Sequence, residues 1–93
     1  MSTKASLLMS SLAEAIYELR LQLEYIDLNI SIVNELMKVA YYNDAEMQIL
    51  LQNLKHLRSQ KTEVIQTVWL HEQKLRYLQG ASAVQEALTQ ARH

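Results

Sequence analysis

The stretch LQLEYIDLNISIV, from Leu21 to Val33, decides the fold of this chain. Its apolar and polar residues nearly alternate, which is the pattern of a half-buried strand. The same residues also fit a helix, provided that the helix carries apolar side chains on two opposite faces. The residues on both sides of the stretch distinguish between these interpretations.

A regular apolar pattern runs through the stretch and beyond it in both directions. Residues spaced alternately by four and three positions are all apolar, namely Ala5, Met9, Leu12, Ile16, Leu19, Leu23, Ile26, Ile30, Val33, Met37 and Ala40. Such a heptad pattern is typical of a helix that packs along a coiled-coil seam. Because the pattern continues unbroken through the stretch, we expect a helix over about residues 4–40.

A second helix is predicted after a short link at residues 41–43. Asn43 followed by Glu46 has the spacing of a capping box, which marks a helix start. The next seam is apolar except for Lys61 and His71, and consists of Met47, Leu50, Leu54, Leu57, Lys61, Val64, Val68, His71, Leu75 and Leu78. We therefore expect a second helix over about residues 44–79.

The sole glycine indicates where this second helix ends. Gly80 comes just after the last seam residue, where a C-terminal cap is expected. Ser82 and Gln85 then have the spacing of a new capping box. We therefore expect a short C-terminal helix over about residues 83–92.

The composition favours a small, entirely helical domain. The 93 residues include one glycine and no proline, which leaves few of the residues that turns between strands require. There is no cysteine, which excludes disulfides and fits a reducing compartment, so we expect a cytoplasmic protein. No stretch approaches 18 uncharged apolar residues, so no membrane span is expected.

Two helices of similar length joined by a short link are expected to fold back as an antiparallel hairpin, which makes residues 1–93 a single domain. Pairing about the link places Ile30 near Leu54, and Leu19 near Val64. Lys61 then lies beside Leu23, and its ammonium group is expected to reach Glu24 or Asp27 while its stem packs in the seam.

The second apolar face of the first helix lies opposite the seam, so a hairpin leaves it uncovered. Three coverings are open: the C-terminal segment of the same chain, a second copy that completes a four-helix bundle, or a different helical protein. The second helix adds a smaller apolar patch. The predicted protein interface consists of Tyr17, Leu21, Tyr25, Leu28, Ile32, Val39, Trp69, Leu70 and Tyr77.

The sequence offers little that indicates catalysis or metal binding. None of His56, His71 and His93 has a second ligand-forming residue three or four positions later, the spacing that places two ligands on one helical face. There is no glycine-rich phosphate loop and no recognisable nucleophile with its base. We therefore expect no enzyme activity, no metal and no cofactor.

The leading functional prediction is a protein–protein interaction module, meaning an adaptor, an assembly factor or a small chaperone-like subunit that binds itself or another helical protein. In size and expected shape the chain resembles the small helical-hairpin chaperones of bacterial secretion systems. One alternative is a small dimeric regulator that binds nucleic acid through Lys55, Arg58 and Lys61, although a net charge of −1 disfavours it. Another is a structural subunit of a larger assembly.

Overall fold

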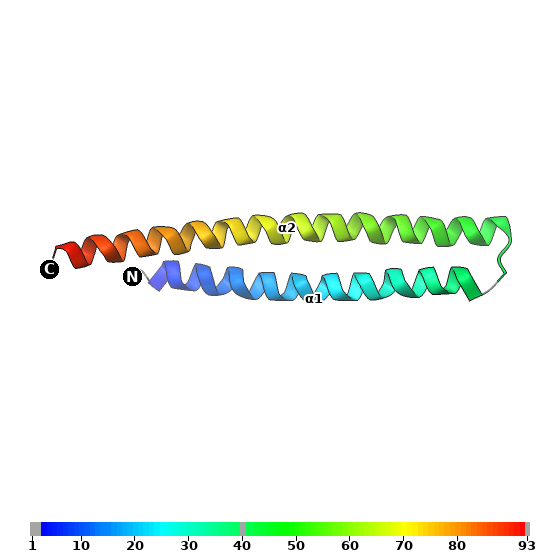
Figure 1. The fold of residues 1–93 in the computed structure, drawn as a ribbon, viewed down its shortest axis with the longest axis horizontal. Helices are drawn as coiled ribbons and strands as arrows, with labels where there is room; N and C mark the ends of the chain where they lie inside the picture. Colours follow the sequence, from blue (N-terminus) through cyan, green and yellow to red (C-terminus); the bar gives the residue numbers. More distant parts are fainter. Residues whose placement is uncertain (1–2, 40, 93) are drawn as a thin grey trace.

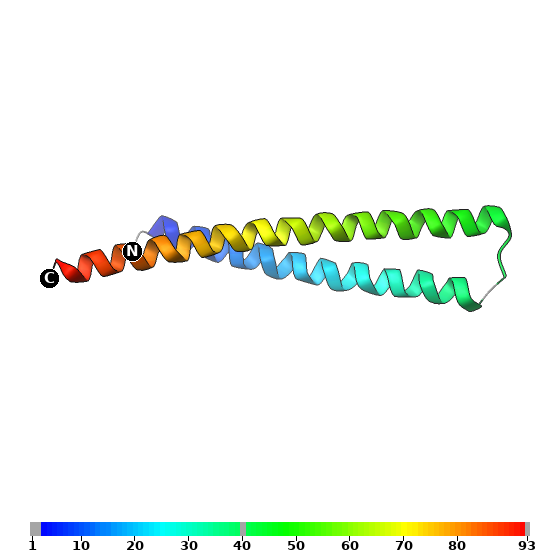
Figure 2. The same cartoon turned by 45° about the horizontal axis from the view of Figure 1, so that its top comes forward.

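The computed structural model describes residues 3–39 and 41–92, which form two long helices, α1 (Thr3–Val39) and α2 (Asp44–Ala91). The helices run antiparallel, side by side, in a rod of 75 × 17 × 14 Å (Figure 1; Figure 2). Within the described residues there is no β-strand, and Leu21–Val33 is helical throughout. The predicted all-α hairpin is therefore confirmed. Ala40, placed at the end of the first seam, lies outside the described residues.

A capping box fixes the start of α2, as predicted. The side-chain oxygen of Asn43 accepts a hydrogen bond from the backbone N–H of Glu46 at 2.8 Å. In return, the Glu46 carboxylate accepts one from the backbone N–H of Asn43 at 3.3 Å. These two bonds satisfy amide groups that have no partner inside the helix. The reversal of the chain is thus encoded locally, immediately before α2.

The predicted seams form the contact between the helices. All their described residues are buried or half-buried, and the most buried side chains are Ile16, Ile26, Leu54 and Val68. Leu8 and Leu12 line the same hollow as Leu78, and Ile26 lines another together with Val64. The shared hollows show the two seams facing each other in antiparallel helices, while the individual pairs Ile30 with Leu54 and Leu19 with Val64 stay a prediction.

The structure corrects the prediction of a separate C-terminal helix. In place of a helix that ends near residue 79 and a second one over residues 83–92, α2 continues through Gly80 to Ala91. Gly80 does not adopt the positive φ of a glycine cap. A glycine inside a helix costs only about 1 kcal/mol relative to alanine, and no proline follows to stop the helix. The C-terminal segment therefore extends away from α1 instead of folding back over it (Figure 1).

The two polar positions of the second seam have different surroundings. The Lys61 ammonium lies 2.6 Å from Asp27 Oδ1, one of the two carboxylates predicted for it. His71 is half-buried, and its Nδ1 atom is buried without a hydrogen-bond partner in the described part of the chain.

Lys61→Leu is expected to raise the free energy of unfolding by on the order of 1 kcal/mol. The side chains of Lys61 and Asp27 are 40% and 53% exposed, and ion pairs this accessible contribute about 1 kcal/mol or less. A leucine at the same position adds apolar burial in the seam. Urea unfolding followed by circular dichroism measures the change, with Lys55→Leu on the exposed surface as the control. Marked destabilisation would show that the hairpin needs the ion pair with Asp27.

Candidate protein interface

The two flanks of the seam differ in charge. On one flank, Arg20 and Glu72 form an ion pair at 2.6 Å between the helices, and Lys61 and Asp27 form a second at the same distance. Heptad geometry places more of the other charged residues on this flank than on the opposite one. We call this flank the charged side, and its charged residues are Arg20, Glu24, Asp27, Lys38, Asp44, Lys55, Arg58, Lys61, Glu72, Arg76 and Glu86.

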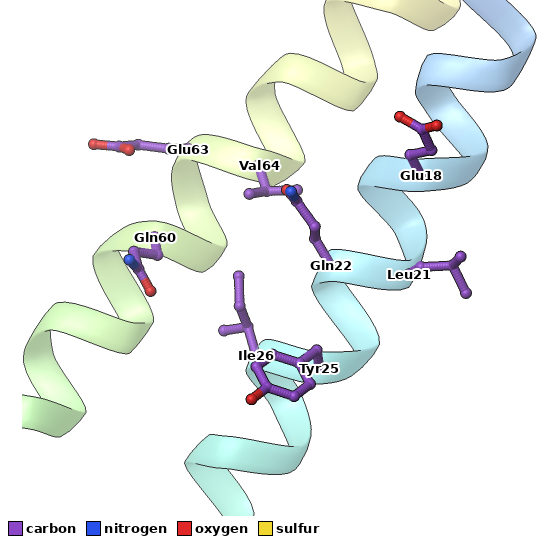
Figure 3. Close-up of a pocket in the computed structure, with 8 residues that line it drawn as sticks. All are labelled: Glu18, Leu21, Gln22, Tyr25, Ile26, Gln60, Glu63 and Val64. Atoms are coloured by element: carbon purple, nitrogen blue, oxygen red, sulfur yellow. The ribbon is translucent and has the colours of Figure 1, made fainter.

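The opposite flank contains two open hollows. One, of about 580 Å³, is lined by Glu18, Leu21, Gln22, Tyr25, Ile26, Gln60, Glu63 and Val64. In Figure 3, Ile26 points toward α2 at its floor, whereas Leu21 points away from α2 at its rim. The other, of about 560 Å³, lies nearer the start of α1 and is lined by Leu8, Leu12, Gln73, Lys74, Tyr77 and Leu78. Both hollows lie between the helices, where a further helix can pack.

Exposed apolar side chains follow this flank along its whole length. We call it the apolar side, and its exposed apolar residues are Leu8, Tyr25, Ile32, Leu36, Val39, Ile49, Leu70, Tyr77, Val84 and Leu88. Its charged residues are fewer than those of the charged side, namely Lys4, Glu18, Glu46, Glu63 and Lys74. A row of large exposed apolar side chains along a helical rod indicates a protein–protein interface.

The structure separates the nine predicted interface residues into three groups, all exposed to solvent. Five of them lie together on the apolar side: Tyr25, Ile32, Val39, Leu70 and Tyr77. Leu21 and Leu28 lie next to them on the outer ridge of α1. Tyr17 and Trp69 lie on the charged side, and Trp69 lines a hollow there together with Leu70.

Sequence reasoning missed five members of the apolar side: Leu8, Leu36, Ile49, Val84 and Leu88. In the heptad pattern they occupy the positions next to the seam on the same flank as Tyr25 and Tyr77. The heptad positions of these residues can be read from the sequence. Which flank of the hairpin forms the interface can be decided only once the flank with the interhelical ion pairs is known.

The hairpin exposes much more surface than a compact protein of its mass. Its accessible area is 7398 Å² at 10.8 kDa, roughly a third more than the value of about 5,500 Å² that is typical of a folded monomer of that mass. Its radius of gyration is 21.2 Å, against about 12 Å for a compact chain of this length. A two-helix rod has no interior apart from its single seam, and no described side chain is fully buried.

No helix in the described part of the chain is both long and apolar enough to cross a membrane. Within residues 3–39 and 41–92, no three side chains of the metal-binding types gather at one place. No protein-family model, curated protein or solved structure matches the chain.

Proposed function

We propose that this chain is a protein–protein interaction module: an adaptor, an assembly factor or a small chaperone-like subunit. Its apolar side binds another helical surface, supplied by a second copy or by a different helical protein, and completes a four-helix bundle. The observation that carries this proposal is the row of exposed apolar side chains on the flank of the seam that has few charges.

The energetics support the same function. Burial of apolar surface contributes about 25 cal/mol per Å², so several large side chains removed from water contribute several kcal/mol. A small domain is stable by only about 5–15 kcal/mol in total. Covering the apolar side is thus comparable in free energy to folding the hairpin, and the partner acts as a part of the core.

Binding of nucleic acid is less well supported. The basic cluster of Lys55, Arg58 and Lys61 lies on α2, but the Lys61 ammonium already contacts the Asp27 carboxylate at 2.6 Å. Phosphate-binding surfaces need several cations that face one strand together. The charged side instead carries carboxylates among its cations.

Placing lysines on the apolar side is expected to abolish association. The variant with Tyr25→Lys and Tyr77→Lys introduces a charge on each helix of that side, and desolvating these charges opposes binding. Sedimentation velocity of wild type, alone and in soluble extract of its native host, should show a species larger than one chain, and this variant should lack it.

The matched control is Tyr17→Lys with Trp69→Lys, which replaces two similarly exposed aromatic residues on the charged side. We expect this control to associate like wild type. The proposed function is wrong if wild type sediments as a single chain under both conditions. The assignment of the interface to the apolar side is wrong if both pairs of substitutions have the same effect.

A further inference from the structure

The two helices differ in length, and the difference leaves part of α2 without a neighbour. α2 has 48 residues and α1 has 37. Leu8 and Leu12, near the start of α1, lie beside residues 73–78, so the last turns of α2 extend past the start of α1 (Figure 1). Val84 and Leu88 on this overhang are exposed. A further apolar surface packed against the overhang would remove these side chains from water.

The opposite end of the apolar side has exposed apolar residues that no helix covers. Near the link, Leu36 and Val39 of α1 and Ile49 of α2 are exposed on the same flank as Val84 and Leu88. One end of the rod thus carries an uncovered apolar helix, and the other end carries an uncovered apolar surface. Within one straight hairpin these two ends cannot meet.

We propose that the apolar side binds the apolar side of a second copy, with the two hairpins antiparallel and the overhang of each covering the link end of the other. This inference rests on the proposed function and selects one partner. Two-fold symmetry is the usual arrangement of homodimers. A rod of 75 Å, in contact over about the 10 Å width of a helix, buries roughly 800 Å² per copy, which is the size of a standard stable interface.

Two charges on the apolar side of α2 favour this direction of packing. Glu63 and Lys74 are eleven residues apart, close to three helical turns, and each lines one of the two hollows. The midpoint between them falls between Val68 and Trp69, which is also near the middle of α2. A two-fold axis at that point stacks α2 against α2 of the second copy and brings Lys74 of each opposite Glu63 of the other.

Neither of these two residues takes part in the ion pairs between the described residues. In a parallel pair of hairpins, α2 would lie over α1 of the second copy, so Lys74 would face the beginning of α1, far from Glu63. Both overhangs would then project from the same end of the dimer without cover. The antiparallel pair places Lys74 of each copy opposite Glu63 of the other and covers both overhangs.

Cysteine cross-linking tests the arrangement directly, because the chain has no native cysteine. The same axis places Leu88 of one copy opposite Ile49 of the other. The variant with Ile49→Cys and Leu88→Cys is expected to form covalent dimers under mild oxidation. The two positions are separated by about 58 Å along one straight helix, so a disulfide cannot form within a chain. Each single-cysteine variant is the control, and we expect it to remain uncross-linked.

Charge exchange provides a second measurement that does not depend on oxidation. Lys74→Glu places two like-charged pairs across the dimer and is expected to weaken self-association on the order of tenfold. Adding Glu63→Lys restores opposite charges and should recover most of the wild-type affinity in sedimentation equilibrium.

The arrangement is wrong if wild type dimerises but the double-cysteine variant gives no covalent dimer, or if the second substitution fails to rescue the first. A second copy is the wrong partner if wild type is a single chain alone yet enters a larger complex in its host extract through Tyr25 and Tyr77. That result would leave the proposed function intact.

Discussion

Leu54→Ala is expected to lower the free energy of unfolding by about 2–5 kcal/mol, the usual cost of truncating a buried leucine. Leu54 is 5% exposed, the least accessible of the four buried side chains of the hairpin. Because a two-helix rod has no other layer that can close around the cavity, we expect a cost in the upper part of that range. Total stability of a domain this small is of the same order, so the variant should be largely unfolded at moderate temperature.

Urea unfolding followed by circular dichroism at one fixed chain concentration measures this change, because association makes apparent stability concentration-dependent. Leu51→Ala is the matched control on the same helix: its side chain is 43% exposed and lies on the charged side. We expect the control to cost less than about 1 kcal/mol. Equal losses in the two variants would mean that the predicted seam is not the core of the hairpin.

The fold could be predicted from the sequence where one pattern extends over many residues. The heptad spacing through Leu21–Val33 distinguished helix from strand, and every described seam residue has its side chain at least partly buried. The link was predictable for a different reason. A capping box is a local signal that needs only Asn43 and Glu46, and both of its hydrogen bonds are present.

The end of the second helix was mispredicted because a local signal competed with its surroundings. Gly80 resembles a C-terminal cap, but a cap is required only where the chain must leave the helix. Most residues on both sides of Gly80 are good helix formers, and α2 continues through them to Ala91. The free-energy cost of a single glycine is too small to end a long helix.

The two sides of the hairpin could be predicted only in part. The sequence shows that α1 has apolar residues opposite its seam, but not which flank of the hairpin they join. That choice depends on the contacts Arg20–Glu72 and Lys61–Asp27, which identify one flank as charged. Long charged side chains can form ion pairs across several different spacings along two helices. The sequence alone therefore did not predict the Arg20–Glu72 pair.

The opposite apolar face of α1 leads to a prediction that separates folding from association. Leu28 and Ile32 lie outside the seam and are 56% and 47% exposed in the hairpin. Replacing them with charged residues in the variant with Leu28→Glu and Ile32→Lys removes no contact of the core. We therefore expect most of the helix content to be retained and association to be lost by about a hundredfold or more, because two charges must be desolvated or excluded at the interface.

Circular dichroism measures the first quantity, and sedimentation of the variant beside wild type measures the second. Ser31→Glu is the control, because it adds a charge to the charged side of α1 at a similar level. It should leave both quantities close to their wild-type values. Loss of helix content in the Leu28 and Ile32 variant would contradict the separation of the two faces. Unchanged association would show that neither Leu28 on the outer ridge of α1 nor Ile32 beside it is part of the interface. In that case the near-alternation of Leu21–Val33 would reflect an apolar ridge that stays exposed to solvent, and the partner would contact only the hollows between α1 and α2.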